Sequence, residues 1–151
     1  MLKRTSKQLS MFSSLEDMLS HQHPLFQLSN KINWECFENA FSPLYCNTNG
    51  RPAHPIRLMC GLLILKHLRN VSDEMVVSQW SENAYYQYFC GGLEFMPKQP
   101  CDASELVHFR NRIGEEGMEL ILAESIRVNT DHDDEDHFDT AFIDSTVQEK
   151  N

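Results

Sequence analysis

One carboxylate near the end of the sequence, Asp144, has neighbours that could place it for metal-dependent chemistry. β-Branched and aromatic residues stand on both sides of this acid in the segment 140–151, a composition typical of a β-strand. A lone strand leaves its backbone groups unpaired and needs partner strands, for which no sequence remains after residue 151. The segment therefore predicts the first strand of an α/β domain that is cut off near its beginning.

Metal-dependent phosphoryl transfer by Asp144 alone is not expected. Such chemistry needs several acids that converge on ions about 3.5–4 Å apart, and Mg²⁺ demands near-octahedral oxygen ligation. Six acids lie between residues 130 and 139, but they precede the predicted strand, with His132 and His137 among them. Because adjacent acids repel one another, we interpret this segment as a solvated linker rather than a metal cage.

A second set of candidate residues, His108, Arg110 and Arg112, lies on a short helix predicted over residues 102–113. A turn precedes this helix, and Asp102 with Glu105 has the spacing of a capping box, which suits a recognition helix in a helix-turn-helix arrangement. Arginine is the side chain best matched to guanine edges and phosphates. The pattern is therefore consistent with DNA contact.

The same spacing allows a second interpretation of this helix. Its apolar residues would form a core face, while its arginines would be solvated or pair with nearby acids, namely Glu105, Glu115 and Glu116. Four other cations could likewise contact phosphates or simply be solvated: Arg51, Arg57, Lys66 and Arg69. The aromatic residues at 85–89 could stack on bases, but their helical spacing beside Trp80 favours the core.

The elements that must position these residues are predicted to be short helices. Capping residues and apolar periodicity predict helices over residues 13–19, 33–41 and 55–69, and a further helix that begins at 72 and runs towards 85. His23-Pro24 is expected to end the first of these helices. A break at Gly114 precedes a helix over 115–128, whose predicted inward residues are Met118, Ile121, Leu122, Ser125 and Ile126. Helix 55–69 is apolar on several sides and should be central, and its Gly61 suggests that another helix crosses closely there.

The expected fold is mainly α, a multi-helix domain with a helix-turn-helix-like part, followed by the first strand of a truncated RNase H-like α/β domain. We expect four segments: an arm and short helix over 1–22, a helical domain over 23–129, an acidic linker over 130–139, and the start of the truncated domain over 140–151. The run of short helices ahead of one strand supports the division between a helical and an α/β domain.

Charge and composition restrict the class of protein. The net charge is −9, but the acidic segment 130–139 accounts for six negative charges, so the remainder is near neutral and local basic patches could contact phosphates. No apolar run approaches the length of a membrane span, and the N-terminus lacks the apolar region of a signal peptide, so a cytoplasmic protein is expected. Five cysteines without CxxC spacing predict reduced, mostly buried thiols.

The order of several motifs resembles insertion-sequence transposases that carry an InsH-like N-terminal domain ahead of an RNase H-like DDE catalytic domain. These motifs run from residue 23 to the end: HPL (23–25), Trp34, Phe41, RP (51–52) with RLM (57–59), SDE (72–74), WSEN (80–83) with YQYFCG (86–91), FRNR (109–112) with GEEG (114–117), and DST (144–146) with QEKN (148–151). The resemblance implies a helical domain that binds duplex DNA at the terminal inverted repeats of a transposon. It favours DNA contact by His108, Arg110 and Arg112, with Arg51 and Arg57 as further contacts.

The resemblance also implies a catalytic domain that cuts and joins DNA with Mg²⁺ or Mn²⁺ held by three carboxylates. Asp144 matches the first of these, and the other two have no sequence to occupy, so we expect the chain to hold no cofactor and to be inactive alone. Family members act as multimers, so the expected partners are duplex DNA, further copies, or a separately made C-terminal half, in the cytoplasm at the nucleoid. The alternatives are a DNA-binding regulator that competes with transposition and a non-functional remnant.

Overall fold

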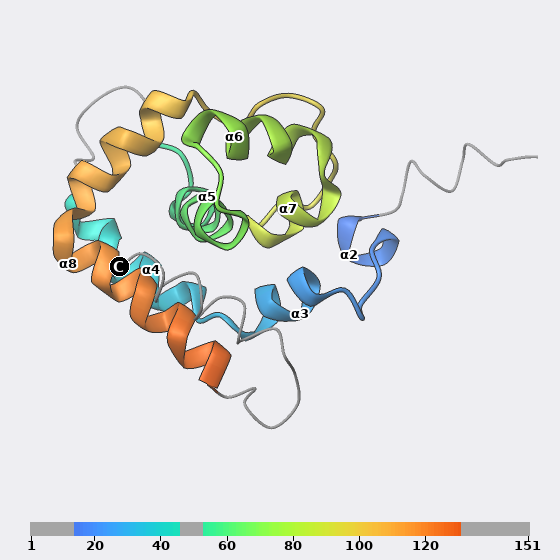
Figure 1. Cartoon of the computed structure of the whole chain (residues 1–151), viewed down its shortest axis with the longest axis horizontal. Helices are drawn as coiled ribbons and strands as arrows, with labels where there is room; N and C mark the ends of the chain where they lie inside the picture. Colours follow the sequence, from blue (N-terminus) through green and yellow to red (C-terminus); the bar gives the residue numbers. More distant parts are fainter. Residues whose placement is uncertain (1–13, 46–52, 131–151) are drawn as a thin grey trace, which may run out of the picture.

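The computed structural model describes residues 14–45 and 53–130, and all regular structure in these two ranges is helical (Figure 1). The elements are α2 (Leu15–Met18), α3 (Pro24–Lys31), α4 (Trp34–Phe41), the 3-10 helix η1 (Ser42–Leu44), α5 (Ile56–Arg69), α6 (Asp73–Glu82), α7 (Ala84–Phe89) and α8 (Ala103–Thr130). The prediction of a mainly helical domain is confirmed. The predicted strand over 140–151 and the acidic linker lie outside the described residues.

Helix α5 is the central element, as its sequence predicts. Its residues from Cys60 to Leu65 are all buried, and it contacts α4, α6 and α8. Figure 1 shows α5 nearly end-on in the middle of the domain, with the other helices around it. A Cβ on Gly61 would lie 2.7 Å from the Cys90 Sγ, so the close approach expected at this glycine is made by the end of α7.

Side-chain caps begin most of these helices. Ser14, Asn33 and Ser72 each accept a hydrogen bond from a backbone N–H in the first turn of α2, α4 and α6. Asn83 caps in the same way, because its Oδ1 accepts from the N–H groups of Tyr85 and Tyr86. The helix predicted to run from 72 towards 85 is therefore two helices, since Asn83 adopts an extended conformation and starts α7.

Helix α3 was not predicted. The sequence suggests that His23-Pro24 ends the first helix, but Pro24 is instead the first residue of α3, where a missing N–H costs nothing. The Nδ1 of His23 accepts from the Leu25 N–H over 3.1 Å and caps the new helix. The buried side chains of α3, including Leu25 and Phe26, pack mainly against α7, and the Phe26 ring stacks on that of Tyr88 at 4.4 Å.

Gly114 divides α8 at the predicted position. Its φ of 67° and ψ of −170° are non-helical, so we name residues 103–113 α8a and residues 115–130 α8b. The predicted inward face of α8b is partly wrong, because Leu122 and Ile126 are 46% and 47% exposed. Ile121 and Ser125 are buried as predicted, and Gly117 and Val128 lie with them on the buried face of α8b.

A buried carboxylate ties α8b to the first helices. Glu124 is 8% exposed, and its Oε1 accepts from the Asn33 backbone N–H over 2.9 Å at the junction of α3 and α4. Arg127 donates to the same carboxylate and also to the Lys31 carbonyl oxygen over 3.2 Å. The Arg127 hydrogen bonds are the main cause that lowers the pKa of Glu124, so this carboxylate is charged and paired at neutral pH.

Candidate nucleic-acid interface

Helix α8a has one buried face and one exposed face. Leu106, Phe109 and Ile113 are buried, as the core interpretation of this helix predicts. His108 and Asn111 are exposed, and neither side chain has a hydrogen bond or ion pair with the residues that the structure describes. Sequence reasoning singled out His108 but missed Asn111, although its position three residues after His108 places both on one face of a helix.

An apolar side chain lies on the same exposed face. Val107 is 41% exposed, four residues before Asn111. Sequence reasoning missed this residue too, because a valine between Leu106 and Phe109 resembles part of the core pattern. The face thus combines an apolar side chain, an imidazole and a carboxamide, and the apolar and carboxamide groups are of kinds that contact base edges in the major groove.

The start of α8a is fixed by Glu105. Its Oε2 accepts from the Asp102 backbone N–H over 3.0 Å, which confirms the predicted capping-box contact. The same oxygen lies 2.8 Å from the His54 Nε2, in the segment just before α5. Glu105 therefore joins the first turn of α8a to the beginning of the central helix.

Arg110 does not pair with the neighbouring glutamates. Its Nη1 and Nη2 donate to the two carboxylate oxygens of Asp73 over 2.9 and 2.8 Å, which joins α8a to the first turn of α6. The Nζ of Lys66 lies 3.0 Å from Oδ1 of the same carboxylate. The hydrogen bond from Arg110 is the main cause that lowers the pKa of Asp73 to about 2.

The other candidate cations lie in different surroundings. The exposed Arg112 places its guanidinium 4.4 Å from the centroid of the Tyr45 ring. Arg57 is half-buried, and its guanidinium lies 4.5 Å from the Trp34 ring and donates to Ser29 Oγ over 3.0 Å. Arg51 and Asp144 lie outside the described residues. The fold thus brings Arg110 and Lys66 together at Asp73, whereas Arg57 belongs to the core.

Helix α6 packs against α8 and supports it through the Asp73 contact. The segment between the two helices, 83–102, contains α7 and is much longer than the short turn of an ordinary helix-turn-helix. The aromatic cluster after α6 is largely core, as predicted, because Tyr86 and Phe89 are 4% and 0% exposed.

Neither a metal centre nor a membrane-spanning helix is present in the part of the chain that the structure describes. No group of three His, Cys, Asp or Glu residues there is arranged to hold a metal ion, and none of its helices has the length and apolarity to span a bilayer. Cys60, Cys90 and Cys101 are free and buried, which agrees with the predicted thiols, and burial raises the pKa of Cys101 to about 11.

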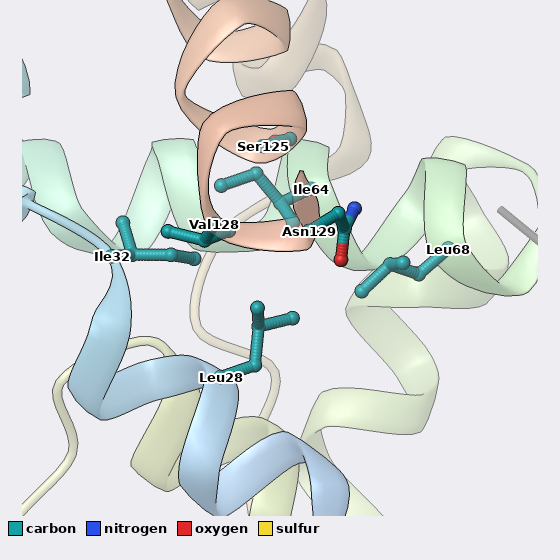
Figure 2. Close-up of a pocket in the computed structure, with 7 residues that line it drawn as sticks. All are labelled: Leu28, Ile32, Ile64, Leu68, Ser125, Val128 and Asn129. Atoms are coloured by element: carbon teal, nitrogen blue, oxygen red, sulfur yellow. The ribbon is translucent and has the colours of Figure 1, made fainter. Parts of the chain in front are cut away.

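A small cavity lies between α3, α5 and α8b (Figure 2). Its volume is about 10 Å³, and it is lined by Leu28, Ile32, Ile64, Leu68, Ser125, Val128 and Asn129. This is the space of a single water molecule at most, so the cavity is a packing defect and not a ligand site.

The described residues form a helical domain in which the exposed face of α8a is flanked by Arg110 and Arg112. The chain belongs to the family described as Transposase domain (DUF772), whose model matches residues 13–112. This confirms the prediction of a transposase-related protein. The matched region includes α8a up to Arg112.

A relative in Rhizobium meliloti is described as "Uncharacterized protein ORF8 in nfe locus". It is 38% identical to this chain over 138 residues, which is 90% of this chain and 66% of the relative. The chain therefore spans just under two thirds of the length of that relative. No solved structure matches the chain.

Proposed function

We propose that this chain is the end-binding part of an insertion-sequence transposase and that it binds duplex DNA of the terminal inverted repeats. The observation that carries this proposal is the exposed face of α8a, on which His108 and Asn111 have no partner among the described residues. In the major groove a carboxamide bonds adenine and an apolar side chain such as Val107 contacts the thymine methyl group. Membership of a transposase-domain family supports DNA as the ligand.

In this proposal α8a acts as the recognition helix, and α6 is the helix that supports it from behind. Arg110 and Arg112 flank the exposed face and supply contacts to phosphates or guanine edges. Arg57 is left out, since its guanidinium is engaged by Trp34 and Ser29. Arg51, outside the described residues, stays a prediction.

We further propose that the domain is of the InsH-like type and works with an RNase H-like DDE catalytic domain. Mg²⁺ or Mn²⁺ would be held there by three carboxylates and would stabilise the attacking and leaving oxygens. Asp144 is the position that matches the first carboxylate, and no described group of residues fits the ions. Cutting and joining would therefore require the rest of that domain, whether in a longer chain or in a partner.

A gel-shift titration with a duplex of the terminal repeat tests the proposed DNA binding. The wild-type chain should bind the repeat more tightly than a shuffled duplex of equal length, and binding should weaken as salt rises because counterions are released. Replacement of both Arg110 and Arg112 by Ala should weaken binding by several kcal/mol if each reads a base, at about 1–3 kcal/mol per good contact.

The matched control is Lys98→Ala, which removes an exposed cation from the loop before α8. This variant should bind like the wild type. Equal binding by the double arginine variant would remove Arg110 and Arg112 from the interface, and equal binding of repeat and shuffled duplexes would remove the terminal repeat as the target.

A further inference from the structure

Two cationic side chains from two helices contact the carboxylate of Asp73 on a third helix. Lys66 near the end of α5 and Arg110 of α8a both contact this carboxylate, which stands in the first turn of α6. The Arg110 contact is bidentate, with two N–H···O bonds of 2.9 and 2.8 Å, a geometry that fixes the plane of a guanidinium. The orientation of Arg110 is therefore set by Asp73.

The bidentate contact leaves most of the Arg110 donors available. A guanidinium has five N–H groups, and only two of them are used by Asp73. No other acceptor among the described residues bonds Arg110. The remaining donors, held in a fixed plane, can bond an anion without first ordering the side chain.

The cluster keeps a net positive charge. Two cations share one carboxylate, and Asp73 is also the least exposed of the three, with 15% of its side chain exposed against 27% for both Lys66 and Arg110. An approaching anion thus meets the cations before the carboxylate. If Arg110 were alone with Asp73, the charges would cancel, so Lys66 decides the sign of this surface.

We propose that Asp73 is a positioning residue, which holds Arg110 and Lys66 side by side as a contact point for a backbone phosphate of DNA. This inference rests on the proposed DNA-binding function and adds to it that different residues of α8a contact the DNA backbone and the bases. Arg110 contacts the backbone and sets the register, whereas His108, Asn111 and Val107 face the bases. Asp73 itself does not touch the DNA.

The test is a set of fluorescence-anisotropy titrations of the full chain with the terminal-repeat duplex at several salt concentrations. Asp73→Asn keeps the shape of the side chain and removes its charge, so Arg110 and Lys66 lose their common partner. We expect affinity to fall about tenfold, as for one lost charge-assisted hydrogen bond, and the salt slope to fall by about one. Because Asp73 acts through Arg110 and Lys66, adding Asp73→Asn to the double variant Arg110→Ala/Lys66→Gln should weaken binding no further.

Glu74→Gln is the matched control, since it removes the adjacent exposed acid and should leave both affinity and salt slope unchanged. Circular dichroism at the titration temperature shows whether each variant is folded. Lys66→Gln provides a second test, because it keeps the Asp73–Arg110 pair that joins α6 to α8a and should still lower the salt slope by about one.

Tighter binding by Asp73→Asn would show that Asp73 sequesters Arg110 and would overturn the inference. Unchanged affinity and salt slope in both Asp73→Asn and Lys66→Gln would overturn it as well, while leaving DNA binding by the chain intact. Failure of the wild-type chain to bind any duplex would instead overturn the proposed function itself.

Discussion

The guanidinium of Arg57 lies 4.5 Å from the centroid of the Trp34 ring and joins three helices around the central one. It donates to Ser29 Oγ in α3 over 3.0 Å and lies within hydrogen-bond reach of the Tyr88 and Phe89 carbonyl oxygens at the end of α7. Burial lowers the pKa of Arg57, although an arginine remains charged at any physiological pH.

Replacement of Arg57 by Met should therefore lower the free energy of unfolding, by about 2–4 kcal/mol, since it removes the cation–π contact with Trp34 and the hydrogen bond to the buried Ser29. Urea unfolding followed by tryptophan fluorescence measures this loss. Arg112→Met is the matched control, because Arg112 has a similar contact with Tyr45 but is exposed, and should change stability by less than about 1 kcal/mol. Similar losses in both variants would contradict a structural role specific to Arg57.

Gln87 should prove essential to the loop that connects α7 to α8. This side chain is fully buried, donates to the carbonyl oxygens of Trp80 and Met96 over 2.9 and 2.8 Å, and accepts from the Met96 N–H over 2.7 Å. Gln87→Met has nearly the same shape but leaves the Met96 N–H and carbonyl oxygen without their partner, so the free energy of unfolding should fall by about 2–4 kcal/mol. Hydrogen exchange at the Met96 amide should also become faster, whereas the exposed Gln99→Met should change neither quantity.

Gly114→Ala should destabilise the domain by about 1–3 kcal/mol, because alanine strongly disfavours the backbone conformation at this kink. Apart from the adjoining backbone, no heavy atom lies within 4 Å of a Cβ built at this position, so the cost comes from the backbone conformation and not from a clash. Comparing the thermal unfolding of Gly114→Ala with that of a protein that carries D-alanine at position 114 separates backbone strain from a packing clash. D-Alanine favours positive φ and should restore most of the stability; equal loss with both residues would point to packing instead.

Acid should weaken the link between α6 and α8. The pKa of Asp73 is lowered from 3.8 to about 2, so its contribution to stability is fully present above about pH 4 and is lost as the pH falls through about 2. The difference in unfolding free energy between wild type and Asp73→Asn, on the order of 1–2 kcal/mol at neutral pH, should shrink over that interval. A difference that stays constant from pH 5 to pH 2 would mean that Asp73 is not held as a charged partner.

Local signals in the sequence are sufficient for much of the fold. Ser72 and Asn33 start helices because their side chains cap N–H groups two or three residues away, and the all-round apolar pattern of α5 requires a central position. The first turn of α3 at Pro24 and the start of α7 at Asn83 are not evident from local sequence. Each residue is compatible with either the end or the beginning of a helix, and contacts with distant elements decide between them.

The candidate site was less accessible to sequence reasoning. His108 and Arg112 are exposed as expected, but the partner of Arg110 lies 37 positions earlier in the chain, at a distance for which no helical spacing rule gives a signal. Leu122 was expected inward because it is apolar and follows Ile121, but it is 46% exposed, since an apolar residue need not face the core. Arg57 was taken for a surface cation because charge alone does not reveal burial.

The hydrogen bond from the Asn33 N–H to Glu124 joins residues 91 positions apart, so it forms late when the protein folds during synthesis. During synthesis α3 and α4 leave the ribosome long before α8b has been made. The backbone N–H of Asn33 and the side chains of Phe37 and Phe41 therefore lack their α8 contacts during this interval. The central helix arrives during this interval with its long apolar run uncovered. The nascent domain is therefore most accessible to chaperones and proteases until Glu124 has emerged from the ribosome. Nascent chains on ribosomes that are stalled before the Glu124 codon should be cleaved by protease far more readily than nascent chains on ribosomes that are stalled well beyond it.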